Sequence, residues 1–528
     1  MLTYFVVIPI LIASLLFVFS NNRSARVLAI ILQSIFTIFS FYLVLLTRGG
    51  ETVTIVGGYI DFLGIYLRAY NISAVFMLLT AVIFLVVSIY SFNTTESRTF
   101  WFLLFVLEAA LTGLYFTRDL FNIFVLVEVS TIVVIILLMY NRERRQMFGG
   151  MIYIMLNIIA MQFYLFGLGY IYKLTGAFDL AYAAERIALA DKGDLVLPYA
   201  LIMAAIAFKC SIIPLFSFTP KTGLYRAAPC AVAAILSGVQ IKTAVYLFMR
   251  LQELFGSFAA HDFFLAVGIA SSITGVIMAI CQTNIKMILA YHTMSQVGLI
   301  IIGLSSGGYY SQIGGLYHVV AHGVFKSALF LTAGVIYRSY GTCDVYKIKG
   351  LMKRMPLTGI ITLAAILGIT GAPLFIGSIS KYFIGYDVPA WLLWTINVIS
   401  LGTIISFIKY SGILFGADNG IKGRYPQSDA WRVWPVVILG ALCLLGGMFG
   451  QAFINFLFNT TVSIDLAGYA EKALIFFASA VIGYFIYKHF VKGNKALKKL
   501  ADLDFSFKTV CMSMGAFCGI ILIFVGLM

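Results

Sequence analysis

Residues 118–138 read RDLFNIFVLVEVSTIVVIILL, an apolar stretch with a single acidic residue near its centre. A stretch of this length can cross about 30 Å of hydrocarbon as an α-helix. A helix also satisfies its own backbone polar groups, which a membrane interior requires. Glu128 lies about nine residues into the stretch, or about 14 Å along a helix axis. A charge at that depth is costly, so we interpret Glu128 as a functional residue.

The rest of the chain has the same character. Of its 528 residues, 62% are apolar and 11% are charged, whereas a soluble domain has roughly 45–50% apolar and about 25% charged residues. The apolar runs are continuous, which disfavours the alternating strands of a barrel. The sequence therefore predicts an all-α polytopic membrane protein. Its sixteen candidate spans lie near residues 2–20, 27–47, 70–91, 99–116, 119–139, 147–172, 195–217, 229–249, 262–282, 285–305, 311–337, 357–384, 391–416, 433–458, 470–487 and 509–527.

The charges of the connecting loops alternate. Odd-numbered loops carry a net charge of +16 and even-numbered loops a net charge of −4. Basic residues mark cytoplasmic loops, so we predict a multi-pass protein of the cell membrane with both termini outside. The pI near 9.3 then reflects topology, and we expect no nucleic-acid partner. The basic stretch 488–503 either lies along the cytoplasmic membrane surface or forms a solvated connector.

Charged residues inside the candidate spans are the strongest functional signal. A single one is also explained by a helix–helix ion pair or by a lysine that reaches the membrane surface. Five lysines and two acids, however, cannot all pair with one another. The seven residues are Glu108, Glu128, Lys209, Lys242, Lys326, Lys381 and Lys409.

Two of these lysines accompany prolines. Pro214 follows Lys209 by five residues, and Pro373 precedes Lys381 in the run Gly371-Ala372-Pro373. Proline removes a helix hydrogen bond and clashes one turn back, so both spans are predicted to be broken. Broken helices five spans apart indicate an inverted internal repeat with sites at the breaks. Two ordinary proline kinks are the simpler alternative.

Histidines form a second signal. His318, His322 and Lys326 follow one another at four-residue spacing and share a helix face. A histidine near its ordinary pKa suits proton relay, which we favour over helix packing or metal binding. No third metal ligand is evident, so we predict no metal site. His292 and Ser295 are possible further steps of the relay.

Lys242, Lys409 and Glu108 are predicted to have different roles. A lysine in apolar surroundings holds its proton less tightly than one in water, so Lys242 is a candidate proton carrier. Lys409 is a possible site that could also reach the membrane surface or a neighbouring subunit. Glu108 could extend the chain of groups beyond Glu128.

Together these elements resemble the antiporter-like membrane subunits shared by Mrp-type Na⁺/H⁺ antiporters, membrane-bound hydrogenases and respiratory complex I. The pattern resembles most the D subunit of Mrp antiporters and its hydrogenase counterpart. Relatives often carry an acid after the proline at position 220, where this chain has Lys221. The matching elements are RDLFNIFVLVEVS, the Lys209–Pro214 break, LSGVQIKTAVYLFMR, NIKMILAYHTMSQVGLIIIGL, HVVAHGVFKSALFLTAG and SISKYF.

The resemblance implies about fourteen core helices with two inverted five-helix repeats, each with a broken helix. The two further C-terminal helices exceed this core and so depart from the family pattern. It implies that Glu128 pairs with Lys209 or with a neighbour's residue. It also implies that a row from Lys242 through the histidines to Lys381 conducts protons. The expected regions are N-terminal helices in 1–98, repeats in 99–250 and 262–416, and C-terminal helices with a short basic connector in 433–528.

The expected function is proton translocation coupled to Na⁺ exchange or to redox chemistry in partner subunits. The expected partners are the lipid bilayer and other membrane subunits, homologous antiporter-like subunits among them. No cluster ligands, dinucleotide fingerprint or P-loop are evident, so we expect no cofactor in this chain. Stand-alone transport of a small solute is the alternative, and a purely structural scaffold is a third class that leaves the buried charges unexplained.

Overall fold

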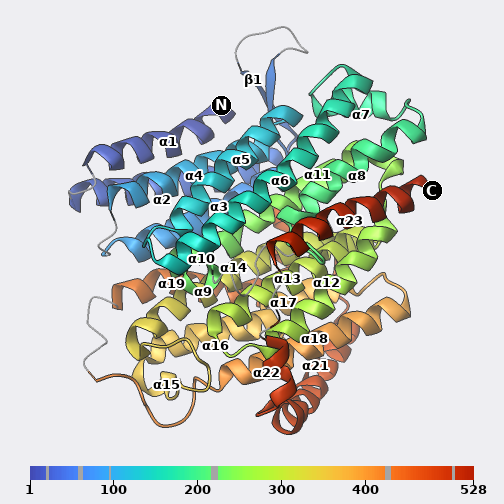
Figure 1. Ribbon diagram of the computed structural model, residues 1–528. Coiled ribbons are helices and arrows are strands. Elements are labelled where there is room, and N and C mark those ends of the chain that lie inside the picture. The colour runs from blue at the N-terminus through green and yellow to red at the C-terminus, as the bar shows by residue number, and fades with distance from the viewer. Residues whose placement is uncertain are drawn as a thin grey trace.

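The structure is a computed structural model that describes residues 1–19, 23–56, 64–93, 97–215, 224–422, 430–501, 503 and 506–527. Long helices, most of them roughly parallel, form a bundle in which the two halves of the chain lie side by side (Figure 1). Helix dominates because apolar segments leave the backbone no other partner in hydrocarbon. The prediction of an all-α polytopic membrane protein is confirmed.

Fourteen helical segments of the described chain are long and apolar enough to cross a membrane. They match fourteen of the sixteen candidate spans, and the other two are those in which the sequence predicts a break. One segment combines α10 (Cys230–Ile235), the π-helix η1 (Leu236–Gln240), α11 (Ile241–Phe255) and the short 3-10 helix η2 (Gly256–Phe258). The others are α1 (Leu2–Phe19), α2 (Arg23–Thr47), α3 (Asn71–Ser91), α4 (Arg98–Phe116), α5 (Leu120–Leu138), α6 (Arg144–Thr175), α12 (His261–Cys281), α13 (Ile285–Ser305), α14 (Tyr309–Tyr340), α18 (Ala390–Ser411), α19 (Ala430–Met448), α21 (Leu466–Ile486) and α23 (Phe507–Gly526).

Both predicted breaks are present. Helix α8 (Lys192–Lys209) ends at its lysine, and Pro214 follows in irregular backbone. The second broken helix consists of α16 (Pro356–Thr370) and α17 (Ile376–Ile384), with Pro373 between them. Gly371 ends α16 in a left-handed conformation with φ of 82°, which glycine adopts without steric penalty. The loop that contains Lys221 lies outside the described residues.

The backbone repeats itself with an offset of 165 residues. Asp119 caps α5 and forms an isolated antiparallel bridge with Asp179. Asn284 caps α13 and forms the same bridge with Asp344. The helices that follow, α6 and α14, are both 32 residues long and also differ in position by 165 residues. Because five spans separate the copies, alternate crossing of the membrane orients them in opposite directions, as inverted repeats require.

Short elements lie at both ends of the bundle (Figure 1). Strands β1 (Thr52–Val56) and β2 (Ile65–Ala69) pair antiparallel, with Thr52 opposite Ala69. The sequence interpretation did not anticipate this hairpin, whose β-branched residues favour strands and which packs on α1 and α4. The loop near residues 173–194 contains helix α7 (Leu180–Ile187). The other short helices are α9 (Leu224–Ala227), α15 (Leu351–Arg354), α20 (Gly450–Phe458), η4 (Tyr487–Val491) and α22 (Lys495–Ala501).

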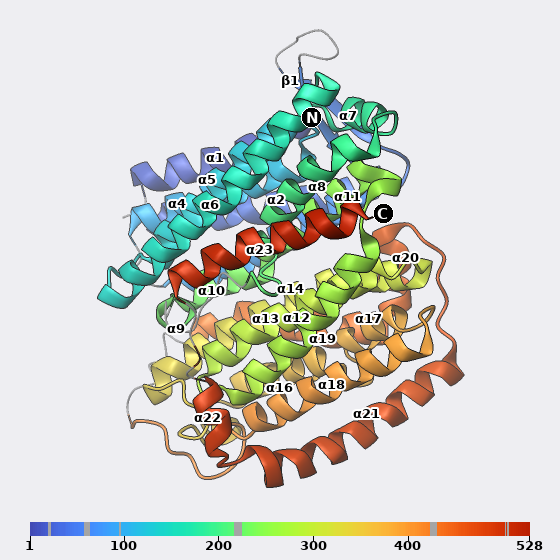
Figure 2. The ribbon, with the colours of Figure 1, turned by 45° about the vertical axis from the view of Figure 1, so that its right-hand side comes forward.

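The last two long helices have different neighbours. Helix α21 lies at the outer edge of the bundle and packs mainly on α18 (Figure 2). Helix α23 returns to the first half of the chain and packs on α8 and α6. The rings of Phe517 and Phe524 on α23 also contact that of Phe263 on α12. The basic connector forms α22 in part, which packs against α12.

Candidate functional site

Lys209, the last residue of α8, points its ammonium group between α5 and α6. Nζ donates hydrogen bonds to Thr131 Oγ1 at 2.9 Å and to Asn157 Oδ1 at 2.8 Å. Glu128 lies one turn before Thr131 on α5 and within electrostatic reach of Lys209. Its Oε1 atom is buried and has no hydrogen-bond partner among the described residues. The structure thus places Glu128 within electrostatic reach of Lys209, without a direct ion pair between the described side chains.

A π-helical turn shapes the surroundings of Lys242. Such turns within α-helices are frequent at functional sites. The ammonium of Lys242 donates to the carbonyl oxygen of Ser237 in η1, so the irregular turn supplies the lysine with an acceptor. At the end of the same turn, the Gln240 Nε2 atom donates to Ser130 Oγ at 3.2 Å. Ser130 adjoins Thr131, which connects this turn to the surroundings of Lys209.

The Ser237 side chain joins the two repeats. Its hydroxyl lies 2.8 Å from the Thr293 hydroxyl on α13. Thr293 Oγ1 also donates to the Leu289 carbonyl at 3.1 Å, and the ammonium of Lys326 donates to that same carbonyl. Lys242 and Lys326 are therefore linked through two hydroxyls and two backbone carbonyls, and both lysines are almost fully buried.

His318 and His322 precede Lys326 on α14, and His318 contacts α17. The two ring nitrogens of His318 lie 2.8 Å from Ser380 Oγ and 3.0 Å from Gln296 Oε1. The rings of His318 and His322 are nearly parallel, with centroids 6.5 Å apart. Both nitrogens of His322, like those of His292, are buried without a partner among the described residues. His322 is within electrostatic reach of Lys242 and Lys326.

Lys381 on α17 reaches back across the second break. Nζ donates to the Ile369 and Thr370 carbonyl oxygens at 3.1 and 3.0 Å. These carbonyls belong to the last turn of α16, where helical acceptors lack internal partners and where a cation is favoured by the helix dipole. Ser380, which contacts His318, directly precedes Lys381. Ser380 and Lys381 therefore connect His318 with the end of α16 at the second break.

A small cavity lies beside Lys381 and involves α21. Its volume is about 60 Å³, and its lining includes Lys381, Asn397 and Lys472, which leaves room for about two waters. Tyr469 on α21 accepts a hydrogen bond from the Leu374 backbone N–H at 3.0 Å. Its hydroxyl also lies 2.8 Å from Ser378 Oγ. Helix α21 is thus bonded directly to the broken helix.

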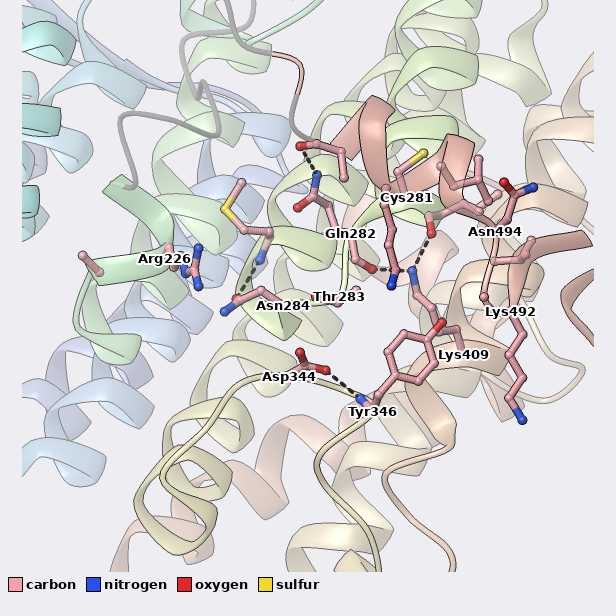
Figure 3. Close-up of a pocket in the computed structure, with 18 of the residues that line it drawn as sticks. Arg226, Cys281, Gln282, Thr283, Asn284, Asp344, Tyr346, Lys409, Lys492 and Asn494 are labelled. Atoms are coloured by element: carbon pink, nitrogen blue, oxygen red, sulfur yellow. Dashed lines mark hydrogen bonds between the residues drawn. The ribbon is translucent and has the colours of Figure 1, made fainter.

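Lys409 lies apart from this row. It occupies the last turn of α18, where Nζ donates to the carbonyls of Ala279 at 3.2 Å and Ile280 at 2.6 Å, and to that of Gln282. It thereby binds the C-terminal end of α12. Lys409 also lines a cavity of about 1440 Å³ (Figure 3), which places it near an end of the bundle.

Glu108 and Ser295 lie outside the row of lysines and histidines. Glu108 is fully buried on α4 and accepts a 2.7 Å hydrogen bond from Gln33 Nε2 on α2. Ser295 lies where α13 touches α12, so close that a Cβ on Gly275 would be 2.6 Å from the Ser295 nitrogen. The structure thus links neither residue by a hydrogen bond to the lysines of the row.

The sequence analysis identified charged residues and histidines but not several polar residues that contact them in the structure. The sequence does contain a signal for them. Each is a polar residue within an apolar span, and each lies near a charged residue or a histidine, either in its own span or at the equivalent position of the other repeat. They are Ser130, Thr131, Asn157, Ser237, Gln240, Thr293, Gln296 and Ser380.

The described residues offer no evident metal site. They contain no group of three or more His, Cys, Asp or Glu side chains that could hold a metal ion. The seven cysteines are all unpaired. The predicted row contains amines, imidazoles and one carboxylate, and hydroxyl and amide side chains contact Lys209 and His318.

The chain is similar to subunits of known membrane complexes. The chain is 29% identical over 496 residues to the D subunit of the Na⁺/H⁺ antiporter of Alkalihalophilus pseudofirmus, covering 89% of this chain and 98% of that protein. It is 29% identical over 383 residues to the N subunit of the NADH-quinone oxidoreductase of Desulforudis audaxviator, covering 68% and 76% respectively. A chain in the structure of the Mrp complex from Dietzia sp. has the same fold, with a TM-score of 0.79, 22% identity and coverage of 91% and 99%.

A family model covers most of the two predicted repeats. The model described as NADH:quinone oxidoreductase/Mrp antiporter, TM, matches residues 117–406, more than half of the chain. That range contains Glu128, the two breaks and both repeats of the α5–α6 pattern. The chain therefore belongs to the NADH:quinone oxidoreductase/Mrp antiporter transmembrane family.

Proposed function

We propose that this chain is a proton-translocating subunit of a multisubunit membrane complex. Protons move along a row formed by Glu128, Lys209, Lys242, the histidines with Lys326, and Lys381. Partner subunits, homologous antiporter-like subunits among them, couple this movement to Na⁺ exchange or to redox chemistry. The membrane is the cell membrane, both termini lie outside, and the cofactors of any redox reaction belong to partner subunits.

The observation that carries the proposal is the set of polar contacts that leads from Lys242 to Lys326 through Ser237, Thr293 and the Leu289 carbonyl. The link consists of two lysines, the backbone carbonyls of Ser237 and Leu289, and the hydroxyls of Ser237 and Thr293, which lie 2.8 Å apart. A purely structural contact would not need two buried lysines, since burying an ammonium group without a carboxylate is costly. Proton transfer, in contrast, requires ionisable groups that lie close to one another.

The histidines extend this link toward Lys381. His318 contacts Ser380, the neighbour of Lys381 in the sequence. Histidine changes charge between about pH 5 and 8, and neutral imidazole can accept a proton on one nitrogen and release one from the other. The free ring nitrogens of His322 and His292 are therefore suited to contact water or a neighbouring ammonium group.

Toward the other end, the row reaches Glu128 through Lys209. Among the described residues, Lys209 donates to Thr131 and Asn157 and contacts no carboxylate directly, and the carboxylate of Glu128 is within electrostatic reach. Movement of the Lys209 ammonium toward Glu128 would form an ion pair, and movement away would break it. This arrangement supports a switch between two states, each with a different proton affinity.

The alternative, stand-alone transport of a small solute, predicts a roomy central site. The cavity beside Lys381 is about 60 Å³, far below the roughly 300 Å³ at which ordinary ligand pockets begin. The larger cavity surrounds Lys409 at one end of the bundle. The distribution of space therefore supports proton movement over solute transport.

Replacement of Lys209 on α8 and of Glu128 on α5 tests the proposal. Lys209→Ala and Glu128→Ala should each abolish proton movement by the complete complex reconstituted in vesicles, while the complex still assembles. Lys192→Ala is the matched control, because Lys192 is exposed at the opposite end of the same helix. Normal pumping by both row variants in an assembled complex would refute the proposed row.

The coupled reaction is tested by the composition of the purified complex. A complex isolated through this chain with iron and nickel would couple proton movement to a hydrogenase-type reaction. A complex of small membrane subunits without metal would couple it to Na⁺ exchange.

A further inference from the structure

The cavity around Lys409 has the features of a ligand site. Its volume is about 1440 Å³, larger than the roughly 300–1,000 Å³ of ordinary small-molecule pockets. Figure 3 shows Arg226 on one side, Lys492 on the other, and Lys409 with Gln282 between them. The walls come from the start of α6, from α9, from the α12–α13 turn and from the basic connector.

The lining carries an excess of positive charge. Apart from Lys409, whose ammonium is bound to carbonyl oxygens, four cationic and two acidic side chains face the cavity. None of the four cations forms an ion pair with another described residue. The cations are Arg144, Arg226, Lys492 and Lys498, and the acids are Glu143 and Asp344.

These cations suit a phosphate group. The guanidinium of arginine presents paired N–H donors that match phosphate oxygens, and lysine supplies a compact point charge. Arg226 and Lys492 belong to segments far apart in the sequence, one in α9 and the other in the connector between α21 and α23. An anion between them would offset the repulsion among like charges that the fold brings together.

An apolar strip leads away from the cavity. Phe148 lines the cavity and is 62% exposed. Met151 and Met155 follow on the same face of α6 and are about half exposed. Helix α6 is one of the membrane-spanning segments, so this strip is a surface on which lipid chains can lie. A free phosphate ion would contact the cations but not the strip.

We propose that this cavity binds the phosphate headgroup of an anionic phospholipid, with the acyl chains along Phe148, Met151 and Met155. The cations lie on the side that the charge distribution of the loops predicts to be cytoplasmic, where anionic lipids concentrate. The lipid holds the basic connector against α9 and so fastens the C-terminal helices to the first half of the chain.

Lipid binding to the complete complex tests the proposal. The complex is depleted of lipid in detergent and titrated with phosphatidylglycerol or with phosphatidylcholine, and bound lipids are counted by native mass spectrometry. Each basic side chain near an anionic lipid contributes about fivefold to affinity. Lys492→Gln/Lys498→Gln should therefore weaken phosphatidylglycerol binding about 25-fold and leave phosphatidylcholine binding unchanged.

The matched control is Lys347→Gln/Lys353→Gln. Both lysines are exposed, lie in a loop on the same predicted side of the membrane, and are absent from the cavity lining. This control should bind phosphatidylglycerol like the wild-type complex. An equal loss of phosphatidylglycerol binding in both double variants would show that the lipid is attracted to the basic surface in general, and would overturn the proposed site. Occupancy by inorganic phosphate alone, with lipid excluded, would equally overturn the assignment to a phospholipid.

Discussion

The hydroxyls of Ser237 and Thr293 lie 2.8 Å apart and join the two repeats of the chain. Ser237 belongs to the π-helical turn that also binds Lys242 through its carbonyl. Thr293 shares the Leu289 carbonyl with Lys326. The pair thus connects the surroundings of Lys242 in the first repeat with those of Lys326 in the second.

Thr293→Val should slow proton translocation. Valine keeps the shape of threonine but removes the hydroxyl, so the link between Ser237 and the Leu289 carbonyl is lost. A hydrogen bond contributes about 1 kcal/mol, which corresponds to about a fivefold lower rate if the link lies on the path. The rate is measured by a pH-sensitive dye in vesicles containing the complex. Thr332→Val is the control, because Thr332 bonds only to carbonyls of its own helix. Equal rates for both variants would remove Thr293 from the path.

Asn157→Asp should impair translocation although it adds a carboxylate. Asn157 Oδ1 lies 2.8 Å from Lys209 Nζ, so aspartate would form a direct ion pair and hold the ammonium away from Glu128. Combining it with Glu128→Gln should not restore activity, because the lysine would still be fixed in one state. Proton uptake at several pH values measures the effect. Full activity of Asn157→Asp would contradict the switching role given to Lys209.

Gly377→Ala should destabilise the second broken helix. A Cβ on Gly377 would lie 1.9 Å from the Gly368 carbonyl oxygen, and backbone atoms at a helix contact cannot move aside cheaply. The expected cost is about 1–3 kcal/mol, as for other overpacked sites, and thermal unfolding in detergent measures it. Gly515→Ala on α23 serves as the control, since a Cβ there meets nothing within 4 Å. This control should be neutral or slightly stabilising, because alanine favours helix.

Tyr469→Phe should loosen α21 from the broken helix. The tyrosine hydroxyl bonds to the Leu374 N–H and to Ser378, and its removal leaves the Leu374 N–H without that acceptor. We expect a loss of about 1–3 kcal/mol in local stability and faster proteolysis near the start of α21. Tyr484→Phe, on the exposed face of the same helix, should leave proteolysis unchanged. Identical cleavage of the two variants would show that the hydroxyl does not fasten α21.

Much of the fold follows from local sequence. Apolar runs long enough to span a bilayer define the helices, and prolines beside Lys209 and Lys381 define both breaks, because these effects act within one turn of helix. The hairpin of β1 and β2 was not anticipated, since its strands are short and are supported by contacts with α1 and α4. The return of α23 to the first half was not evident either, because an apolar helix can pack on any apolar surface.

The sequence alone determined which residues carry unusual chemistry, since a charge in an apolar run is conspicuous wherever the run folds. Tertiary structure decided which of them meet. It links Lys242 with Lys326 through Ser237 and Thr293, sets Glu128 near Lys209 without direct contact, and moves Lys409 to the end of α12. The reason is geometric, because hydrogen bonds extend about 3 Å and only the packing of distant helices brings their side chains within that distance.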